Sequence, residues 1–387
     1  MKRVAAWLAG AMLITSGACT RPASGSLPDS KAAPDADITA EAWAWADSVL
    51  AGLTLEERAG QLVMPSVFAR ADSAAMRRLL GYATDHHISG VVLLRGDIAS
   101  AALLADTLQR LSPAGAFVAI DAEWGLAMRL DSAPAYTPNA ELPAATDDQA
   151  MYDYGRSVAR QCRRLGINMV LGPVADVATS AASPVAARSF GSDPERVARL
   201  ATAYARGLEA GGVISVAKHF PGLGASDADT HQATAINPDS LRALDATHLL
   251  PFRRYVDAGL SGIMVGHVEV PALDSGGRPA TVSPHIMGTL LRGDMGFHGL
   301  IITDALNMGG AGGASAAEAI AAGADLVLCP ADTRRAIGSM LDAVAAGRMG
   351  ADVISERARR VLFFKYIFGA AARGRVAPAG PADIASL

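Results

Sequence analysis

The chain has 387 residues, with 34 lysines and arginines against 38 aspartates and glutamates, for a formal net charge of −4. This weakly acidic balance, without a basic cluster, argues against nucleic acid as a partner. The length allows two domains, or one α/β barrel with extensions at its ends.

The first 18 residues predict a secretory signal peptide. Lys2 and Arg3 precede an apolar run, residues 4–14, that is too short to cross a bilayer as a helix. The small residues before Cys19 resemble a bacterial lipoprotein signal, in which this cysteine is lipidated and becomes the first mature residue. We therefore expect a lipoprotein of the bacterial envelope, anchored to a membrane and facing the periplasm or the cell surface. Ordinary cleavage near Ala18, with a soluble product, is the alternative.

Composition divides the rest of the chain into three parts. Residues 19–40 are rich in Pro, Ser, Ala and Asp, which predicts a flexible tether. Residues 41–370 are expected to form the catalytic domain, and residues 371–387 a loose C-terminal tail. Cys162 and Cys329 stand alone and have no metal-binding spacing.

Short apolar runs alternate with amphipathic helical segments through the central part. The runs lack the polar alternation of half-exposed strands, which indicates strands buried on both faces in a helix-covered parallel sheet. Eight alternations favour a (β/α)8 TIM-type barrel in the α/β class. An open doubly wound sheet often has a glycine-rich turn after its first strand, and residues 61–73 contain no glycine. The predicted strands are 61–67, 90–94, 116–121, 168–177, 214–220, 262–268, 300–305 and 326–330; helical segments are 71–86, 147–166, 194–211 and 240–259.

Polar side chains lie within or at the ends of five of these strands. In barrel enzymes the site lies at the carboxyl edge, where the loops after the strands converge. Because unpaired buried charges are costly, five such strands predict a functional rim. The residues are Asp121, Asp176, Lys218, His219, His267 and Asp304.

The segment KHFPGLGASDADTH, residues 218–231, concentrates ionisable side chains in one loop. Asp229 and His231 are two positions apart, so in an extended loop the carboxylate can meet the imidazole and raise its proton affinity. Gly222 and Gly224 predict unusual backbone angles, as in a lid that closes over a substrate.

Other reaction types lack their motifs. GHVEVP is not the HExxH of a zinc peptidase, and GLGASDADT lacks the GK[ST] of a phosphate-binding loop. A carboxylate at a strand end, Asp304, can attack an electrophilic sugar carbon while a histidine carries the proton.

The loop also satisfies the pattern K-H-[FI]-P-G-[HL]-G-x4-D-[ST]-H at every fixed position. On this motif the chain resembles the barrel domain of glycoside hydrolase family 3, in its β-N-acetylglucosaminidase branch. The resemblance covers about residues 48–370 and continues through AIDAEWGLAMRL, GPVADV, AARSFGSDP and LIITDALNM. It implies a retaining exo-β-N-acetylglucosaminidase that hydrolyses terminal β-linked GlcNAc from cell-wall or related glycans.

The resemblance also implies roles for the matching residues. Asp304 matches the nucleophile, His231 the acid/base, and Asp229 its dyad partner. The expected partner is a carbohydrate, with neither a cofactor nor a metal. Arginine and carboxylate clamps suit the hydroxyls of a sugar. The implied sugar contacts are Asp121, Arg129, Arg188, Lys218 and His219.

One segment departs from the branch, which usually reads DxEGGRVxR where this chain reads DAEWGLAMR. Trp124 and Leu126 make the rim more apolar, and Trp124 is either a sugar-stacking platform or a packing residue. A β-glucosidase or β-xylosidase of the same family, and a non-catalytic glycan-binding lipoprotein, are the alternatives. The complete dyad argues against the former, since those relatives usually take their acid from another domain, which we do not expect here. A neutral imidazole would not repel phosphate, so phosphorolysis beside hydrolysis stays chemically possible.

Overall fold

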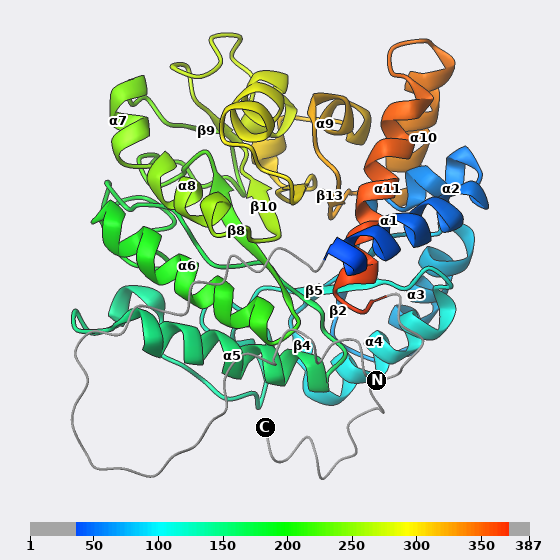
Figure 1. Cartoon of the computed structure of the whole chain (residues 1–387), viewed down its shortest axis with the longest axis horizontal. Coiled ribbons are helices and arrows are strands. Elements are labelled where there is room, and N and C mark those ends of the chain that lie inside the picture. Colours follow the sequence, from blue (N-terminus) through cyan, green and yellow to red (C-terminus); the bar gives the residue numbers. More distant parts are fainter. Residues whose placement is uncertain (1–35, 371–387) are drawn as a thin grey trace.

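The computed structural model describes residues 36–370 (Figure 1). The predicted signal peptide, the lipidated Cys19, most of the tether and the C-terminal tail lie outside the described residues. Helix α1 (Ala36–Ala51) begins inside the predicted tether, so the boundary at residue 40 is too late. Ala42 and Ala46 of this helix are buried against α11 (Ala351–Ile367), and such packing stabilises a helix that composition alone does not indicate.

The strands form a closed parallel barrel in chain order, which confirms the predicted (β/α)8 fold. A seven-stranded sheet has the order β12-β10-β8-β7-β5-β3-β2. The eighth position closes it: β13 pairs with β1, and Leu326 bridges to Ile302 of β12. Pro65 separates β1 from β2, which are two parts of the first strand. The barrel strands are β1 (Val63–Met64), β2 (Ser66–Phe68), β3 (Gly90–Leu94), β5 (Phe117–Ile120), β7 (Met169–Val170), β8 (Ile214–Phe220), β10 (Gly262–Val265), β12 (Leu300–Thr303) and β13 (Val327–Leu328).

Helices cover the outside of the barrel, and Figure 1 shows α5 and α6 side by side along one edge. Aspartate side chains cap many of them: Asp72, Asp97, Asp147, Asp193 and Asp332 each accept a backbone N–H of the first turn. These caps explain where the helices begin. The helices after the strands are α3 (Ser73–Asp85), α4 (Ile98–Leu111), α5 (Asp148–Arg164), α6 (Pro194–Ala210), α7 (Leu241–Ala246), α8 (Leu249–Asp257), the π-helical η5 (His285–Asp294), α9 (Ala316–Ala322) and α10 (Thr333–Ala345).

The helical segment predicted at 240–259 is two helices, α7 and α8, rather than one. Pro251 lies in the first turn of α8, where it lacks the N–H that would bond to the carbonyl of Thr247. Its ring would also clash with that carbonyl in a continuous helix. A proline near a helix start is tolerated because that N–H needs no helical partner.

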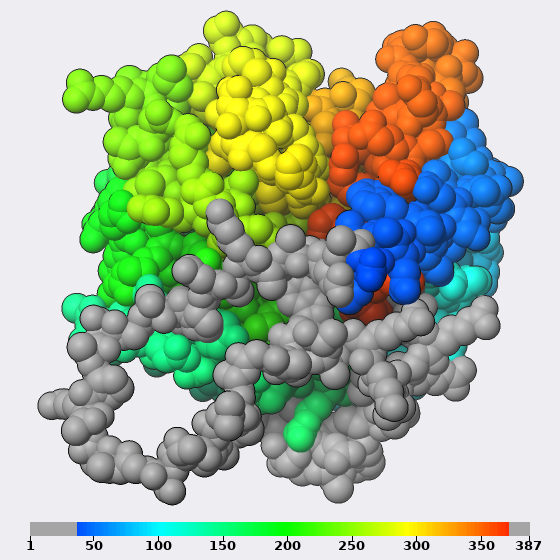
Figure 2. Space-filling model, viewed as in Figure 1, coloured from blue at the N-terminus to red at the C-terminus, as the bar shows by residue number. Residues whose placement is uncertain are grey.

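The face opposite the carboxyl edge of the strands is closed by α11 and α2 (Leu55–Gly60). The side-chain nitrogen of Lys365 donates to Gln61 Oε1 at 2.6 Å and to the Gly115 carbonyl at 2.9 Å, and both partners precede strands of the barrel. In Figure 2 the blue segment with α1 and the orange-red segment with α10 and α11 form one continuous surface. None of the helices within residues 36–370 has the length and apolar character needed to span a membrane.

Candidate active site

Charged residues from three strand ends form a connected cluster at the carboxyl edge of the barrel. Lys218, in β8, places its ammonium 2.7 Å from both Asp121 Oδ1 and Glu123 Oε1, on the loop after β5. Arg129 donates to Asp121 Oδ2 at 2.8 Å, and Arg188 forms a two-bond pair with Glu123 at 2.6 and 3.0 Å. Paired groups in such a cluster are held in fixed positions, as a binding site requires.

The cluster keeps its members ionised although they are buried. Burial would raise the pKa of Glu123, but the charges of Lys218 and Arg188 outweigh it and lower that pKa to about 2. Asp121 follows the same pattern, with Lys218 and Arg129 as the opposing charges. For Lys218, burial is outweighed by the two carboxylates, which raise the pKa. The site therefore presents fixed charges and hydrogen-bonding groups suited to a polar ligand.

His219 is oriented by a buried aspartate. Asp176 Oδ2 accepts a hydrogen bond from His219 Nδ1 at 2.7 Å and another from the His219 backbone N–H at 3.1 Å. The other oxygen of Asp176 accepts from the Leu223 N–H at 2.7 Å. With Nδ1 bonded to Asp176, the Nε2 atom of His219 faces Arg188, whose Nη2 lies 3.5 Å from it.

Asp304 follows β12 and is only 9% exposed. Its Oδ1 accepts the N–H of Ala305 at 2.8 Å. Burial would raise the pKa of Asp304, but His219, His267, this N–H and Lys218 together hold it below the usual value. The carboxylate is therefore ionised at neutral pH, as a nucleophile needs to be.

Asp229 and His231 meet as predicted, on the loop between β8 and β9 (Ala235–Ile236). Nδ1 of His231 lies 2.8 Å from Asp229 Oδ1, which also accepts the His231 backbone N–H at 2.9 Å. These two hydrogen bonds are the main cause of the lowered pKa of Asp229. The imidazole is 70% exposed, so its Nε2 is open to solvent and to an incoming ligand.

This dyad loop, residues 221–237, is docked on the turn that follows Asp304. The Gly309 N–H donates to the His231 carbonyl at 3.1 Å, and the Gly310 N–H donates to the Thr230 carbonyl at 2.9 Å. A Cβ on Gly310 would lie 2.5 Å from that Thr230 oxygen, so only glycine allows this approach. The structure thereby brings the candidate nucleophile and the candidate proton donor into one assembly.

Two glycines of the dyad loop differ in their roles. Gly222 has φ +128°, as the predicted unusual backbone angle requires. Gly224 has no positive φ, so the prediction of an unusual angle there is wrong. Instead, a Cβ at Gly224 would lie 1.8 Å from the carbonyl oxygen of Val177, and the close approach of two backbones explains the glycine.

Six of the eight predicted catalytic and sugar-contact residues lie together at the carboxyl edge of the barrel. The other two, Asp229 and His231, form a pair on the dyad loop, which bonds to the turn after Asp304. The six are Asp121, Arg129, Arg188, Lys218, His219 and Asp304. Glu123 and Asp176 are the residues that sequence reasoning missed: Glu123 was not selected, and Asp176 was placed on the rim without a role. The spacing D-x-E after the third strand could have indicated Glu123, since alternate positions share a face. No sequence signal pairs it with Lys218, 95 positions away.

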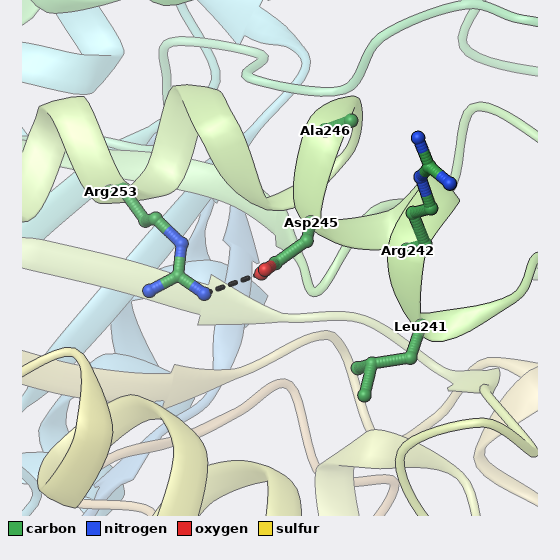
Figure 3. Close-up of a pocket in the computed structure, with 5 residues that line it drawn as sticks. All are labelled: Leu241, Arg242, Asp245, Ala246 and Arg253. Carbon is green, nitrogen blue, oxygen red and sulfur yellow. Dashed lines mark hydrogen bonds and ion pairs between the residues drawn. The ribbon is translucent and has the colours of Figure 1, made fainter.

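An open hollow on the outer surface lies at α7 and α8 (Figure 3). It is lined by Leu241, Arg242, Asp245, Ala246 and Arg253, and Arg253 pairs with Asp245 at 2.6 Å. None of these side chains belongs to the charged cluster, so we assign no substrate binding to it. Within the described part of the chain, no three His, Cys, Asp or Glu side chains are placed to hold a metal ion.

Residues 54–364 match the family model described as the glycosyl hydrolase family 3 N-terminal domain. The chain belongs to glycoside hydrolase family 3. This agrees with the barrel and with the position of the charged cluster at its carboxyl edge. The match covers most of the described residues, including both the dyad loop and the turn after Asp304.

Named family 3 relatives share this region. The chain is 28% identical over 342 residues to a β-N-acetylglucosaminidase/β-glucosidase of Cellulomonas fimi, covering 84% of this chain and 60% of that enzyme. It is 35% identical over 256 residues to a β-hexosaminidase of Chromobacterium violaceum, covering 62% of this chain and 71% of the relative. A solved family 3 β-N-acetylglucosaminidase from Paenibacillus sp. str. FPU-7 superposes with a TM-score of 0.78 at 30% identity, covering 86% of this chain and 67% of that one.

Proposed function

We propose that this family 3 chain is a retaining exo-β-N-acetylglucosaminidase acting on terminal β-linked GlcNAc of cell-wall or related glycans. The observation that carries the proposal is the buried, ionised Asp304 joined through its following turn to the Asp229–His231 pair. One nucleophile and one acid/base are the groups that a retaining glycosidase needs. The name of the Paenibacillus relative supports GlcNAc as the sugar, and that of the Chromobacterium relative supports a hexosamine.

In the proposed mechanism, Asp304 attacks the anomeric carbon while His231 donates a proton from Nε2 to the leaving oxygen. Asp229 holds the imidazole through Nδ1. Water, activated by His231, then releases the sugar from Asp304 with retention of configuration. Asp121, Arg188 and Lys218 bind the hydroxyl and acetamido groups of the terminal sugar.

The test is release of nitrophenol from a panel of nitrophenyl β-glycosides of GlcNAc, glucose and xylose. The GlcNAc glycoside should be turned over fastest, and Asp304→Ala should lower kcat by more than about a thousandfold without unfolding the protein. Azide should restore turnover of the variant and give an α-configured glycosyl azide. Near-normal turnover by purified Asp304→Ala would exclude Asp304 as the nucleophile, and a wild type that cleaves none of the panel would favour a glycan-binding protein.

β-Glucosidase activity is the second candidate, because the Cellulomonas relative is named for both activities. The same panel distinguishes the two by the ratio of kcat/KM for GlcNAc and glucose. Running the reaction with inorganic phosphate and analysing for a sugar 1-phosphate separates phosphorolysis from hydrolysis, which we expect to be the main reaction.

We further propose that Cys19 is lipidated and anchors the enzyme to a membrane of the bacterial envelope. The support is the basic start, the short apolar run and the small residues before Cys19, followed by a polar segment. The native protein should fractionate with membranes, and Cys19→Ser should move it to the soluble fraction with unchanged kcat. Wild-type protein found wholly in the soluble fraction would favour cleavage near Ala18 instead.

A further inference from the structure

His267 is buried at the centre of the assembly described above, although it cannot reach a substrate. It lies between β10 and β11 (Val268–Glu269), and none of its surface is exposed. Nε2 lies 3.0 Å from the carbonyl oxygen of Ala305, the residue directly after Asp304. A carbonyl only accepts, so Nε2 carries a proton and donates to Ala305, while Nδ1 lies 3.0 Å from the Thr281 hydroxyl.

The same residue also contacts the dyad loop. Its backbone carbonyl accepts the N–H of Ala235, at the end of that loop, at 3.1 Å. The Cβ of His267 packs against Gly310, since a Cβ added to Gly310 would lie 3.2 Å from it. Gly310 in turn donates to the carbonyl of Thr230, next to His231. His267 therefore contacts both the turn behind the nucleophile and the segment that carries the proton donor.

We propose that His267 is a positioning residue that holds the Asp304 turn and the Asp229–His231 loop in one fixed arrangement through the bond from its Nε2 to Ala305. The N–H of Ala305 orients the Asp304 carboxylate at 2.8 Å, so holding the Ala305 carbonyl holds the residue that aims the nucleophile. The hydrogen bond from the Ala235 N–H to the His267 carbonyl holds the end of the dyad loop beside the same residue.

Two substitutions separate this role from simple packing. In His267→Gln the amide nitrogen stands as far along the side chain as Nε2 and can still donate to Ala305. In His267→Asn the amide group stands where Nδ1 was, so it can hydrogen-bond to the Thr281 hydroxyl but does not reach the Ala305 carbonyl. Each variant keeps one of two buried hydrogen bonds, so both should lower the melting temperature by similar amounts.

The expected result is a difference in kcat between two variants of similar stability. His267→Asn should lower kcat by on the order of a hundredfold with little change in KM, since small misplacements of reacting groups are that costly. The loss should be seen for activated and poor leaving groups alike, because the nucleophile itself is misplaced. His267→Gln should keep kcat within about fivefold of the wild-type value, because its amide still donates to the Ala305 carbonyl. Equal losses of kcat in the two variants would overturn the proposal.

The kinetic part rests on the proposed function, so a second measurement is independent of any substrate. Amide hydrogen exchange should become faster in both 229–236 and 304–312 in His267→Asn, because the amides of Gly309 and Gly310 bond across this contact. In His267→Gln the exchange of 304–312 should stay near wild type. Faster exchange confined to the segment around Thr281 would contradict the role, whereas failure of the wild type to cleave the glycoside panel would contradict only the proposed activity.

Discussion

At the scale of single residues, the two proposed catalytic groups stand in opposite environments. Asp304 is 9% exposed and is kept ionised by surrounding positive groups, whereas the side chain of His231 is 70% exposed. Few water molecules can hydrate a buried carboxylate, which favours its attack on carbon. An exposed imidazole can exchange its proton with solvent between the two steps of a retaining reaction.

This contrast predicts how His231→Ala depends on the leaving group. A natural disaccharide needs protonation of its leaving oxygen, so its kcat/KM should fall by about a hundredfold or more, while an activated nitrophenyl glycoside should lose much less in the first step. The measurement compares kcat/KM for both substrates in wild type and variant. His298→Ala, an exposed histidine before β12 at the opposite edge of the barrel, is the control and should change neither value. The same factor lost on both substrates would show that His231 is not the acid.

At the scale of elements, the dyad loop and the turn after β12 fold against each other through backbone groups. Thr234 Oγ1 adds a bond to the Gly310 carbonyl at 3.0 Å, and β9 pairs with β11 beyond the dyad. The exposed side chains of the dyad therefore stand on a loop whose backbone is held at several points. Hydrogen bonds along the backbone of the loop, rather than burial of the side chain, fix the position of the imidazole.

The contact predicts that Gly310→Ala displaces the dyad loop. A Cβ would meet the Thr230 and Ala233 carbonyls at 2.5 and 2.9 Å, so one of the two backbones has to shift. We expect kcat/KM for a disaccharide to fall by about tenfold to a hundredfold through misplacement of His231. Gly338→Ala, in α10 with open space around it, is the control and should be neutral or stabilise the protein by up to about 1 kcal/mol. Unchanged activity of Gly310→Ala would mean that the loop position does not depend on this contact.

At the scale of the whole molecule, a buried lysine, Lys365, and a partly buried glutamate, Glu209, lie at the face opposite the site. Burial lowers the pKa of Lys365 to about 7, and burial raises the pKa of Glu209 to about 7 despite its bonds to Ser215 and Ser261. The two groups change the stability in different pH ranges. Above pH 7, the Lys365 amine binds more protons in the unfolded state than in the folded state. Between about pH 4.5 and 7, the Glu209 carboxyl binds fewer protons in the unfolded state than in the folded state.

Stability should therefore fall between about pH 4.5 and 7 through Glu209 and rise above pH 7 through Lys365. One fully coupled group changes the free energy of unfolding by about 1.4 kcal/mol per pH unit. Urea unfolding of wild type and Lys365→Met at pH 7 to 8.5 should show wild type gaining about 2 kcal/mol relative to the variant. The Glu209→Gln variant should still gain stability above pH 7, but its stability should not fall between about pH 4.5 and 7. A difference between wild type and Lys365→Met that does not vary with pH would contradict a neutral Lys365.

Much of the architecture and part of the site follow from local sequence. Apolar runs without alternation predicted all eight strand positions of the barrel, because burial on both faces leaves that pattern in each strand separately. The polar residues at strand ends predicted the rim, and Asp229 and His231 are two positions apart, so their contact is local. The split at Thr247 was missed since the apolar pattern continues across it, although Pro251 was a visible signal.

Tertiary structure alone decided which of these residues act together. Lys218 reaches Asp121 across 97 positions of sequence, and Glu123 enters the cluster only because its loop folds beside Arg188. The contact of Gly310 with the dyad loop and the central place of His267 depend on loops that leave three different strands. Spacing records which side chains share a face of one element, whereas ion pairs and close backbone approaches depend on distances between elements that only the closed barrel sets.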